Sequence, residues 1–316
     1  MIIFDQPDRF AQFHQSCVAT IGKFDGVHLG HQLILDQLKQ RAEEMNLPTL
    51  VILLEPHPEE FFAGPYGDPP ARLNVVREKL ELLESFGVDF VFRLNFDEKI
   101  SSLSADSYIK EILVNGLGVA VFIIGNDFRF GHKRQGDFAL LQQRGSELGF
   151  EVEETSTYEY NGLRISSSYI RKELAVSNFA LVEQLLGRPY SIRGEVQQGR
   201  KLARDLGYPT CNVDLNRQTL PLHGVFACEV RLADRAFIAA VNVGYKPTVT
   251  DERTALLEAH LLDFDENLYG KSIEVIFRHQ IREEMKFDGL DDLKAQMGKD
   301  IDKVREMMDA RIEQRA

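Results

Sequence analysis

The first 187 residues alternate between short apolar runs and segments of helical periodicity, and this alternation constrains the fold more than any other feature. Apolar, β-branched runs are expected as strands at 18–22, 49–54, 90–94, 119–125 and 151–154. Helices are expected from residue 31, at 76–85, after residue 104 and at 136–148. Strands that alternate with helices pair in parallel, because each crossover helix returns the chain in the same direction. The sequence therefore predicts a doubly wound, Rossmann-like α/β domain with a mainly parallel sheet.

From Tyr190 onward the pattern changes to short alternating strands separated by Gly, Pro and Asp turns. Strands are expected at 192–196, 224–232, 237–243 and 272–281. Residues 290–311 place apolar side chains on one helical face, at Leu293, Met297, Ile301, Val304 and Met308. This half is predicted to be a small antiparallel β-barrel with a closing α-helix. The length of 316 residues fits two domains, which we expect at 1–187 and 188–316.

Composition narrows the class of protein. Hydrophobic residues make up 44% and charged residues 27% of the chain, as in ordinary globular proteins. A net charge of -12 argues against a general nucleic-acid-binding surface, which needs clustered Lys and Arg. The apolar runs are too short to span a bilayer, the N-terminus lacks the pattern of a signal peptide, and the three cysteines form no CxxC pair. We expect a cytoplasmic protein without nucleic-acid or membrane partners, and leave its oligomeric state open.

A first candidate site follows the first predicted strand. The segment from Gly22 to His31 opens a helix at the carboxyl end of the sheet, where open α/β folds bind ligands. Gly22, Phe24 and Gly30 belong to a backbone that can approach a phosphate, and the helix start offers unpaired N–H groups. His28 and His31 add donors that can stabilise charge on a transferred phosphoryl group. The pattern indicates attack on an α-phosphate, although histidines in such a motif also serve as simple helix caps.

Two further segments add polar and aromatic groups to this half. The loop after the strand at 119–125 combines polar and aromatic side chains suited to a flat ring ligand, at Asn126, Asp127, Phe128 and Arg129. A later helix is preceded by Ser166, Ser167 and Ser168, with Arg171 beyond them. Hydroxyls and a guanidinium suit the outer phosphates of a nucleotide. A serine run alone is also compatible with ordinary capping.

Together with Pro56, His57 and Pro58, these segments closely resemble the FMN adenylyltransferase module of prokaryotic bifunctional riboflavin kinases/FMN adenylyltransferases, the FAD synthetase family. The matching motifs occur in order at 28–31, 56–58, 125–131 and 165–171. The resemblance implies a nucleotidyltransferase fold in which the first and last motifs hold ATP. It implies that the PHP and DFRFG segments form the flavin side. Ser168 stands where the family often has Thr, and it keeps the hydroxyl.

A second candidate site lies in the predicted barrel. Glycine-rich turns at Gly199 and Gly207 surround Arg204 and lead to Thr210 and Asn212. These groups suit a nucleotide-phosphate and Mg²⁺ cradle, because hard cations take oxygen ligands. The same residues also fit a purely structural turn.

Glu258 lies in a strand whose pattern is otherwise apolar on alternate positions. A carboxylate there can take a proton from a substrate hydroxyl, whereas a lone strand carboxylate is often just solvated. The region from Pro189 to the end resembles the riboflavin kinase domain, which implies Glu258 as base and Thr210 and Asn212 as nucleotide and metal ligands. Ala203 and Lys246 depart from the family pattern, where Gly and Arg are common, and predict a weakened kinase.

The predicted function is therefore two-step flavin cofactor synthesis: ATP-dependent phosphorylation of riboflavin to FMN, then adenylylation of FMN to FAD with release of pyrophosphate. Mg²⁺ is the expected cofactor, with ATP as co-substrate and flavin as substrate and product. Three alternatives remain at this point. They are another ATP-using enzyme with the HxGH motif, a flavin-binding module without catalysis, and a metal hydrolase built on His28, His31 and His57, which lacks the HExxH glutamate.

Overall fold

The computed structural model describes residues 1–7, 10, 16–64, 67–125, 127–155, 159–198, 207–215, 217, 219–245 and 255–315. Five residues named above, Asn126, Gly199, Ala203, Arg204 and Lys246, lie outside the described residues. The chain forms two compact units. The first comprises Met1–Pro70 and Val76–Ser166, and the second comprises Ala71–Val75 and Ser167–Ala316. We refer to them as the α/β unit and the barrel unit.

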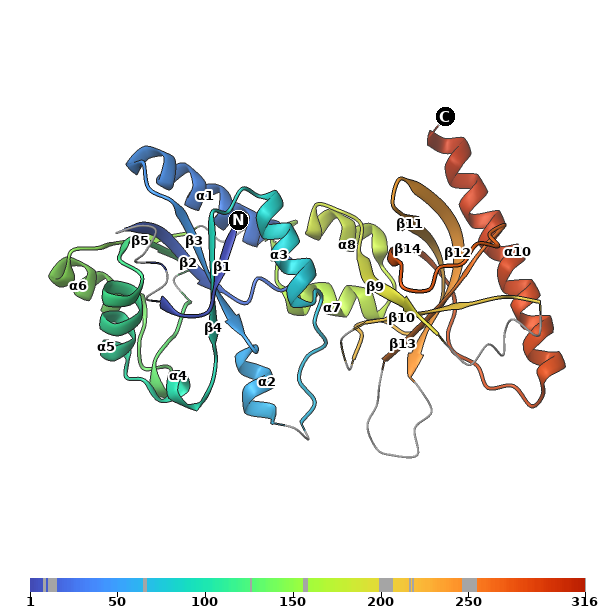
Figure 1. Cartoon of the computed structure of the whole chain (residues 1–316), viewed down its shortest axis with the longest axis horizontal. Helices are drawn as coiled ribbons and strands as arrows, with labels where there is room; N and C mark the ends of the chain where they lie inside the picture. The colour runs from blue at the N-terminus through green and yellow to red at the C-terminus, as the bar shows by residue number, and fades with distance from the viewer. Residues whose placement is uncertain are drawn as a thin grey trace. The chain divides into compact units, whose positions relative to one another are not determined.

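Within the described residues, the α/β unit holds a six-stranded sheet in the order β1-β4-β3-β2-β5-β6 (Figure 1). The strands are β1 (Ile2–Phe4), β2 (Cys17–Gly22), β3 (Thr49–Glu55), β4 (Phe90–Asn95), β5 (Val119–Ile124) and β6 (Glu151–Glu154). Each described strand pair of this sheet is parallel, which confirms the predicted fold class of this half. The short edge strand β1 was not predicted.

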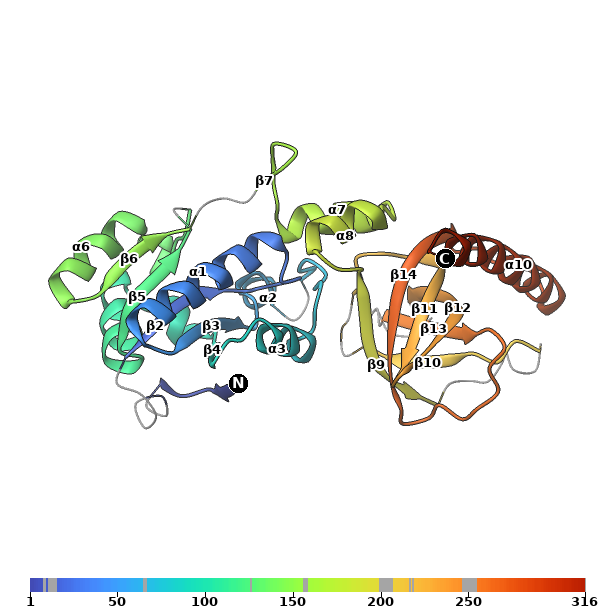
Figure 2. The same ribbon diagram turned by 90° about the horizontal axis from the view of Figure 1, so that it is seen from above.

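Helices cover both faces of the sheet, as the alternating side chains of its strands require. Val18 packs with residues of α1 (Leu29–Met45) and α3 (Val76–Ser85), and Figure 2 shows α1 running along the sheet. Its neighbours Cys17 and Ala19 pack on the opposite face with the π-helix η2 (Tyr108–Gly116) and α6 (Phe138–Leu148). The smaller elements are α2 (Pro58–Ala63), α4 (Glu98–Ser102), α5 (Ala105–Ser107), η3 (His132–Arg134), β7 (Glu159–Tyr160) and β8 (Leu163–Arg164).

The strand order has a reversal point between β2 and β5. From β2 the chain builds outward through β3 to β4, and then returns to place β5 on the other side of β2. In open α/β sheets, ligands bind outside the carboxyl ends of the strands at such a point. The loops after β2 and β5 carry the HxGH and DFRFG segments, so the fold brings both segments to this edge.

The described strands of the barrel unit close into an antiparallel barrel in the order β10-β13-β12-β11-β14-β9. They are β9 (Ser191–Gln197), β10 (Cys211–Asp214), β11 (Gly224–Leu232), β12 (Arg235–Tyr245), β13 (Ala255–Leu261) and β14 (Ser272–Arg282). Alternate side chains such as Phe226, Cys228 and Val230 are fully buried. The predicted antiparallel barrel is thus confirmed.

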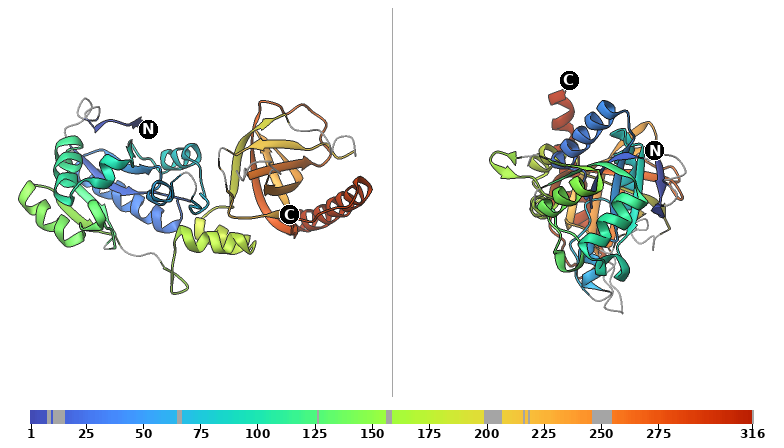
Figure 3. Two further views of the ribbon diagram at one scale, coloured as in Figure 1. Left: turned by 90° about the horizontal axis from the view of Figure 1, so that it is seen from below. Right: turned by 90° about the vertical axis from the view of Figure 1, so that its left-hand side faces the viewer.

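The closing helix α10 (Leu290–Arg315) packs on the outside of the barrel, as predicted (Figure 3). Val304 and Met308 bury their side chains against Val225 and Ala227 of β11. Asp300 accepts hydrogen bonds from the guanidinium of Arg282 on β14, at 2.8 to 3.1 Å. The helix is therefore fixed by an apolar face and an ion pair.

Helices α7 (Ser167–Ala175) and α8 (Phe179–Leu186) belong to the barrel unit. Phe179 of α8 stacks on Phe277 of β14, with ring centroids 6.0 Å apart, which explains this grouping. The predicted domain boundary after residue 187 stays a prediction. No helix in the described ranges is both long enough and apolar enough to span a membrane.

Candidate active sites

The loop between β2 and α1 has an unusual backbone. Phe24, Gly26 and Val27 have φ angles of 47°, 86° and 39°. Positive φ is ordinary for glycine but strained for a bulky or β-branched residue, and such strain collects at functional sites. Gly22 lies close to this turn, and a Cβ at its position would lie 3.1 Å from the Phe24 ring, which is a tight contact. The sequence-predicted residues of this loop therefore form a tightly shaped turn at the start of a helix.

His28 and His31 lie against each other at the start of α1. His28 is the N-cap, and its Nδ1 accepts a hydrogen bond from the His31 N–H at 3.3 Å. The two rings stack with centroids 3.8 Å apart, and Phe24 packs 4.9 Å from the His31 ring. Burial, followed by the charges of His28, Lys79 and Lys23, holds the pKa of His31 well below its ordinary value. His31 is therefore a neutral imidazole beside a helix N-terminus.

The capping alternative for these histidines holds only in part. His28 does cap the helix, but His31 lies inside the first turn of α1. Within the described part of the chain, the buried Nδ1 of His31 has no hydrogen-bond partner. Gly30 lies in the same turn, and the N–H groups at the start of a helix have no carbonyl partner within the helix, although that of His31 is capped by His28. The turn can thus offer both backbone and imidazole groups to an anion.

The PHP segment is tied to a buried lysine that the sequence analysis did not single out. His57 is 4% exposed and Lys79, on α3, is fully buried. The Lys79 ammonium donates to Glu55 Oε1 at 2.7 Å and lies 3.1 Å from His57 Nε2. Pro56 and Pro58 flank His57 and are half-buried. The segment is thus fixed at the carboxyl end of β3, beside β2.

The loop after β5 offers a partly exposed polar surface over aromatic rings. Asp127 forms an ion pair with Arg164 of β8 at 2.7 Å. Phe128 stacks on Phe130 with centroids 5.5 Å apart and an interplanar angle of 11°. Arg129 is exposed and donates to the Phe128 carbonyl. Arg164, one residue before the ISSxxIR motif, was not predicted as a site residue.

The serine motif lies at the start of α7, in line with the prediction of hydroxyls at a helix start. Ser166 precedes the helix, and Ser167 and Ser168 are its first two residues. Arg171 follows one turn later, and its Nε donates to the Ala71 carbonyl at 2.5 Å. One of its five donors is thus used to fasten the 71–75 segment to α7.

In the barrel, strand register aligns polar side chains that are far apart in sequence. Glu258 of β13 pairs directly with Asn212 of β10 on one side and with Asn242 of β12 on the other. Directly opposed residues project to the same face of a sheet, so the three side chains form a row. Burial raises the pKa of Glu258 above its ordinary value, and a hydrogen bond from Asn242 partly offsets this. A carboxylate with a raised pKa is a better base for a hydroxyl proton.

Thr210 precedes β10 and lies two residues before Asn212, so both residues fall on the same side of an extended segment. Their hydroxyl and amide oxygens are hard donors of the kind that Mg²⁺ takes, and the carboxylate of Glu258 neighbours Asn212. Gly207, with φ of 93°, begins the described part of this segment. This donor set fits the predicted magnesium ion. Among the described residues, no group of three or more His, Cys, Asp or Glu side chains is arranged to hold a metal.

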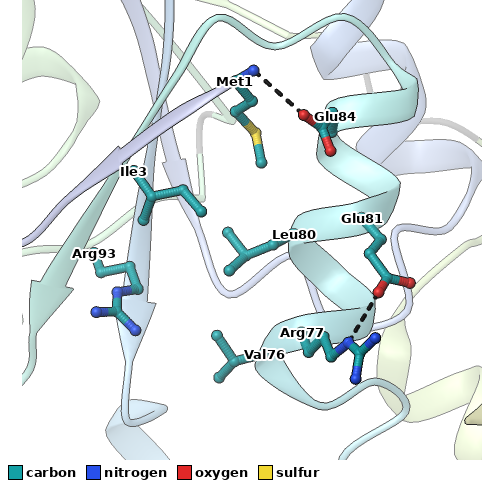
Figure 4. Close-up of a pocket in the computed structure, with 8 residues that line it drawn as sticks. All are labelled: Met1, Ile3, Val76, Arg77, Leu80, Glu81, Glu84 and Arg93. Atoms are coloured by element: carbon teal, nitrogen blue, oxygen red, sulfur yellow. Dashed lines mark hydrogen bonds and ion pairs between the residues drawn. The ribbon is translucent and has the colours of Figure 1, made fainter. Parts of the chain in front are cut away.

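A surface pocket of about 490 Å³ lies on the α/β unit (Figure 4). It is lined by Met1, Ile3, Val76, Arg77, Leu80, Glu81, Glu84 and Arg93. The terminal ammonium of Met1 and the Arg77 guanidinium are paired with Glu84 and Glu81, at 3.3 and 3.1 Å. None of the predicted site residues lines this pocket.

Comparison with known proteins decides between the alternatives left open by the sequence. The family model described as FAD synthetase matches residues 10–169, and the one described as Riboflavin kinase matches residues 186–308. The chain belongs to the family of bifunctional riboflavin kinases/FMN adenylyltransferases. The predicted function, phosphorylation of riboflavin to FMN and adenylylation of FMN to FAD, is thereby confirmed, with ATP and flavins as its substrates.

Named relatives extend over nearly the whole chain. The bifunctional riboflavin kinase/FMN adenylyltransferase of Haemophilus influenzae is 47% identical over 289 residues, 91% of this chain and 93% of that protein. The Escherichia coli protein of the same name is 46% identical and covers 90% of this chain and 91% of its own. A crystal structure titled as a macrolide-efflux protein from Streptococcus pneumoniae matches with a TM-score of 0.79 and 26% identity, covering 96% and 98% of the two chains.

Proposed function

We propose that each compact unit carries one of the two reactions, with the α/β unit transferring AMP to FMN and the barrel unit phosphorylating riboflavin. The division follows the two family matches, at residues 10–169 and 186–308. Supporting it, the two candidate sites differ in chemistry: a histidine pair that includes the neutral His31 at a helix N-terminus in one, and a carboxylate of raised pKa in the other. A cytoplasmic location stays a prediction.

In the kinase reaction, Glu258 accepts the proton of the ribityl 5′-hydroxyl as that oxygen attacks the γ-phosphorus of ATP. The bond from the γ-phosphorus to its bridging oxygen breaks, and ADP leaves with FMN as the product. Thr210 and Asn212 would hold Mg²⁺, which supplies charge neutralisation at the phosphates. The observation that supports this role is the row of Asn212, Glu258 and Asn242, because it presents a partly buried carboxylate between two amides.

In the adenylyl transfer, a phosphate oxygen of FMN attacks the α-phosphorus of a second ATP, and pyrophosphate leaves. FMN phosphate is already an anion, so this step needs no strong base. His28, His31 and the N–H groups at the start of α1 stabilise the charge that grows on the transferred group. The PHP and DFRFG segments are proposed to bind the flavin. A role for Ser166, Ser167, Ser168 and Arg171 at the ATP phosphates stays a prediction. The stacked imidazole pair at the reversal point of the sheet carries this assignment.

A His28→Ala variant tests the first-site assignment. We expect its adenylyltransferase kcat to fall by about 100-fold, since one preorganised donor of this kind contributes on that order. Kinase activity, measured on the same preparation as FMN formed from riboflavin, should remain at the parent level. An unchanged adenylyltransferase kcat would refute the assignment.

A further inference from the structure

A buried lysine is the feature of the α/β unit that the reactions above leave without a role. Lys79 projects from α3 and has 0% of its surface exposed. Its ammonium donates to Glu55 Oε1 at 2.7 Å and lies 3.1 Å from His57 Nε2. Burying an ammonium group is costly unless it is paired and hydrogen-bonded, so this arrangement needs a physical account.

We propose that Lys79 is a positioning residue of the adenylyltransferase, which fixes the ring orientation of His57 and thereby shapes the flavin side of the site. The inference rests on the proposed function, in which the PHP segment binds the flavin. Lys79 itself is not required to touch the substrate.

The orientation of the His57 ring follows from its contact with Lys79. A charged lysine has three N–H donors and no acceptor, so a ring nitrogen 3.1 Å away must accept. Nε2 therefore accepts from Lys79, and this contact fixes the orientation of the ring. On the backbone side, the Glu60 carboxylate accepts from the His57 N–H at 2.9 Å. Lys79 thus contacts the ring of His57, and Glu60 binds its main-chain N–H.

An ion pair for stability alone does not explain the arrangement. A buried pair recovers in mutual attraction about what it loses in hydration, so apolar residues of similar volume commonly serve as well. Helix α3 provides an apolar line through Val76, Leu80 and Leu83, and Lys79 lies three residues after Val76 and four before Leu83, on the same face. A lysine at such a position is best explained by its contact with a second partner besides Glu55, the imidazole of His57.

The charge of Lys79 also reaches the HxGH motif. It is one of the groups that hold the pKa of His31 below its ordinary value, after burial and the charge of His28. One buried cation on α3 therefore acts on both the motif after β2 and the motif after β3. Its effect is to keep the imidazole of His31 neutral and that of His57 in a fixed orientation.

The test uses the full-length protein with both Glu55→Gln and Lys79→Met. Changing both partners leaves no unpaired buried charge, which protects the fold. We expect the KM for FMN in adenylyl transfer to rise about tenfold, the effect of losing one hydrogen bond to a charged donor. The KM for ATP and the riboflavin kinase activity should stay at parent values. Lys39→Met, at an exposed position of α1, is the matched control and should change none of these constants.

Adding His57→Ala separates positioning from structure. If Lys79 acts through His57, the triple variant has the same KM for FMN as His57→Ala alone. A parent KM in the double variant, or effects that multiply in the triple variant, would overturn the inference and leave the proposed function standing. A parent KM in His57→Ala would overturn the inference and the proposed role of the PHP segment in flavin binding, but not the assignment of the two reactions.

A measurement on the parent protein does not depend on any variant folding. Nitrogen chemical shifts of ¹⁵N-histidine, with the His57 signal identified by its loss in His57→Ala, report which ring nitrogen carries the proton. We expect no proton on Nε2, which accepts from Lys79. A proton on Nε2 would contradict the proposed contact with a charged Lys79.

Discussion

The two units assemble their candidate sites in different ways. In the α/β unit, site residues lie in loops at the carboxyl ends of neighbouring parallel strands, and each motif is continuous in sequence. In the barrel unit, the central row joins Asn212, Asn242 and Glu258 through strand register across three strands. The first kind of site is specified by local turns and a helix start, and the second by long-range pairing. A substitution in the α/β site is therefore expected to disturb one loop. A substitution that alters strand pairing in the barrel is expected to displace all three side chains of the row.

The charges of the two sites differ as well. Burial and neighbouring positive groups keep the His31 imidazole neutral, whereas burial raises the pKa of the Glu258 carboxyl. A neutral imidazole suits donation to a growing anion, and a carboxylate of raised pKa suits removal of a proton. The comparison predicts that the two activities can be abolished separately.

The largest expected effect is that of Glu258→Gln. Loss of a positioned base typically costs about 10²- to 10⁴-fold, so the riboflavin kinase kcat should fall within that range. FAD formation from supplied FMN should keep its parent rate. Glu195→Gln, at an exposed position of β9, is the control and should leave both rates unchanged. A Glu258→Gln kinase with parent kcat would remove the proton-transfer role.

The converse change is His31→Ala, which should lower the adenylyltransferase kcat by about 10²- to 10³-fold and spare the kinase. Because the pKa of His31 is held well below its ordinary value of 6.5, the ring gains its proton only at lower pH. The parent adenylyltransferase should therefore show no His31 titration as pH falls to 6.5. An inflection near 6.5 that disappears in His31→Ala would contradict the neutral-imidazole account.

The units should also differ in response to a core change. Val304 is fully buried between α10 and the barrel, and Val304→Ala removes apolar contact and leaves a cavity. We expect the free energy of unfolding of the barrel unit to fall by about 2 kcal/mol. Thermal unfolding followed by loss of each activity measures this, with exposed Lys294→Ala as the control. An equal shift in the loss of both activities would show that the units unfold together.

The smallest expected effect is that of Asn242→Ala, which tests whether Asn242 acts on Glu258 within the barrel row. Asn242 lowers the pKa of Glu258 against the larger effect of burial, so Asn242→Ala should raise that pKa further. Since the base must be deprotonated, the acidic limb of kinase kcat/KM should move to higher pH. Well above this limb the rate should approach the parent value. A limb that stays in place would mean that Asn242 does not act on Glu258.

The sequence predicted features that depend on local motifs better than features that depend on long-range strand pairing. Continuous motifs and periodic segments located the sheet, the barrel, α10 and the HxGH turn, because each depends on neighbours in sequence. Strand β1 spans only Ile2–Phe4, too short for a periodic pattern, and β10 only Cys211–Asp214. The alternation of β12 places Asn242 on the outer face of the barrel. Its pairing with Glu258 depends on the register between β12 and β13, which no local sequence pattern determines. The sequence analysis named Glu258 and missed Asn242 for this reason.

Lys79 was missed for another reason. In an amphipathic helix, a lysine is normally assigned to the solvated face. The available signal was its spacing from Val76 and Leu83, which places it on the apolar face of α3. A charged residue on such a face indicates a buried partner, and here the partners come from residues 55 and 57, which are more than 20 positions away.

The most direct test of the account is to separate flavins by chromatography after incubating the purified protein with riboflavin, ATP and Mg²⁺, and separately with FMN, ATP and Mg²⁺. We predict FMN and then FAD from riboflavin, and FAD from supplied FMN. With Glu258→Gln, FAD should form only from supplied FMN, and with His28→Ala, riboflavin should yield FMN that accumulates. If either variant abolished both reactions while remaining folded, the assignment of one reaction to each unit would be wrong.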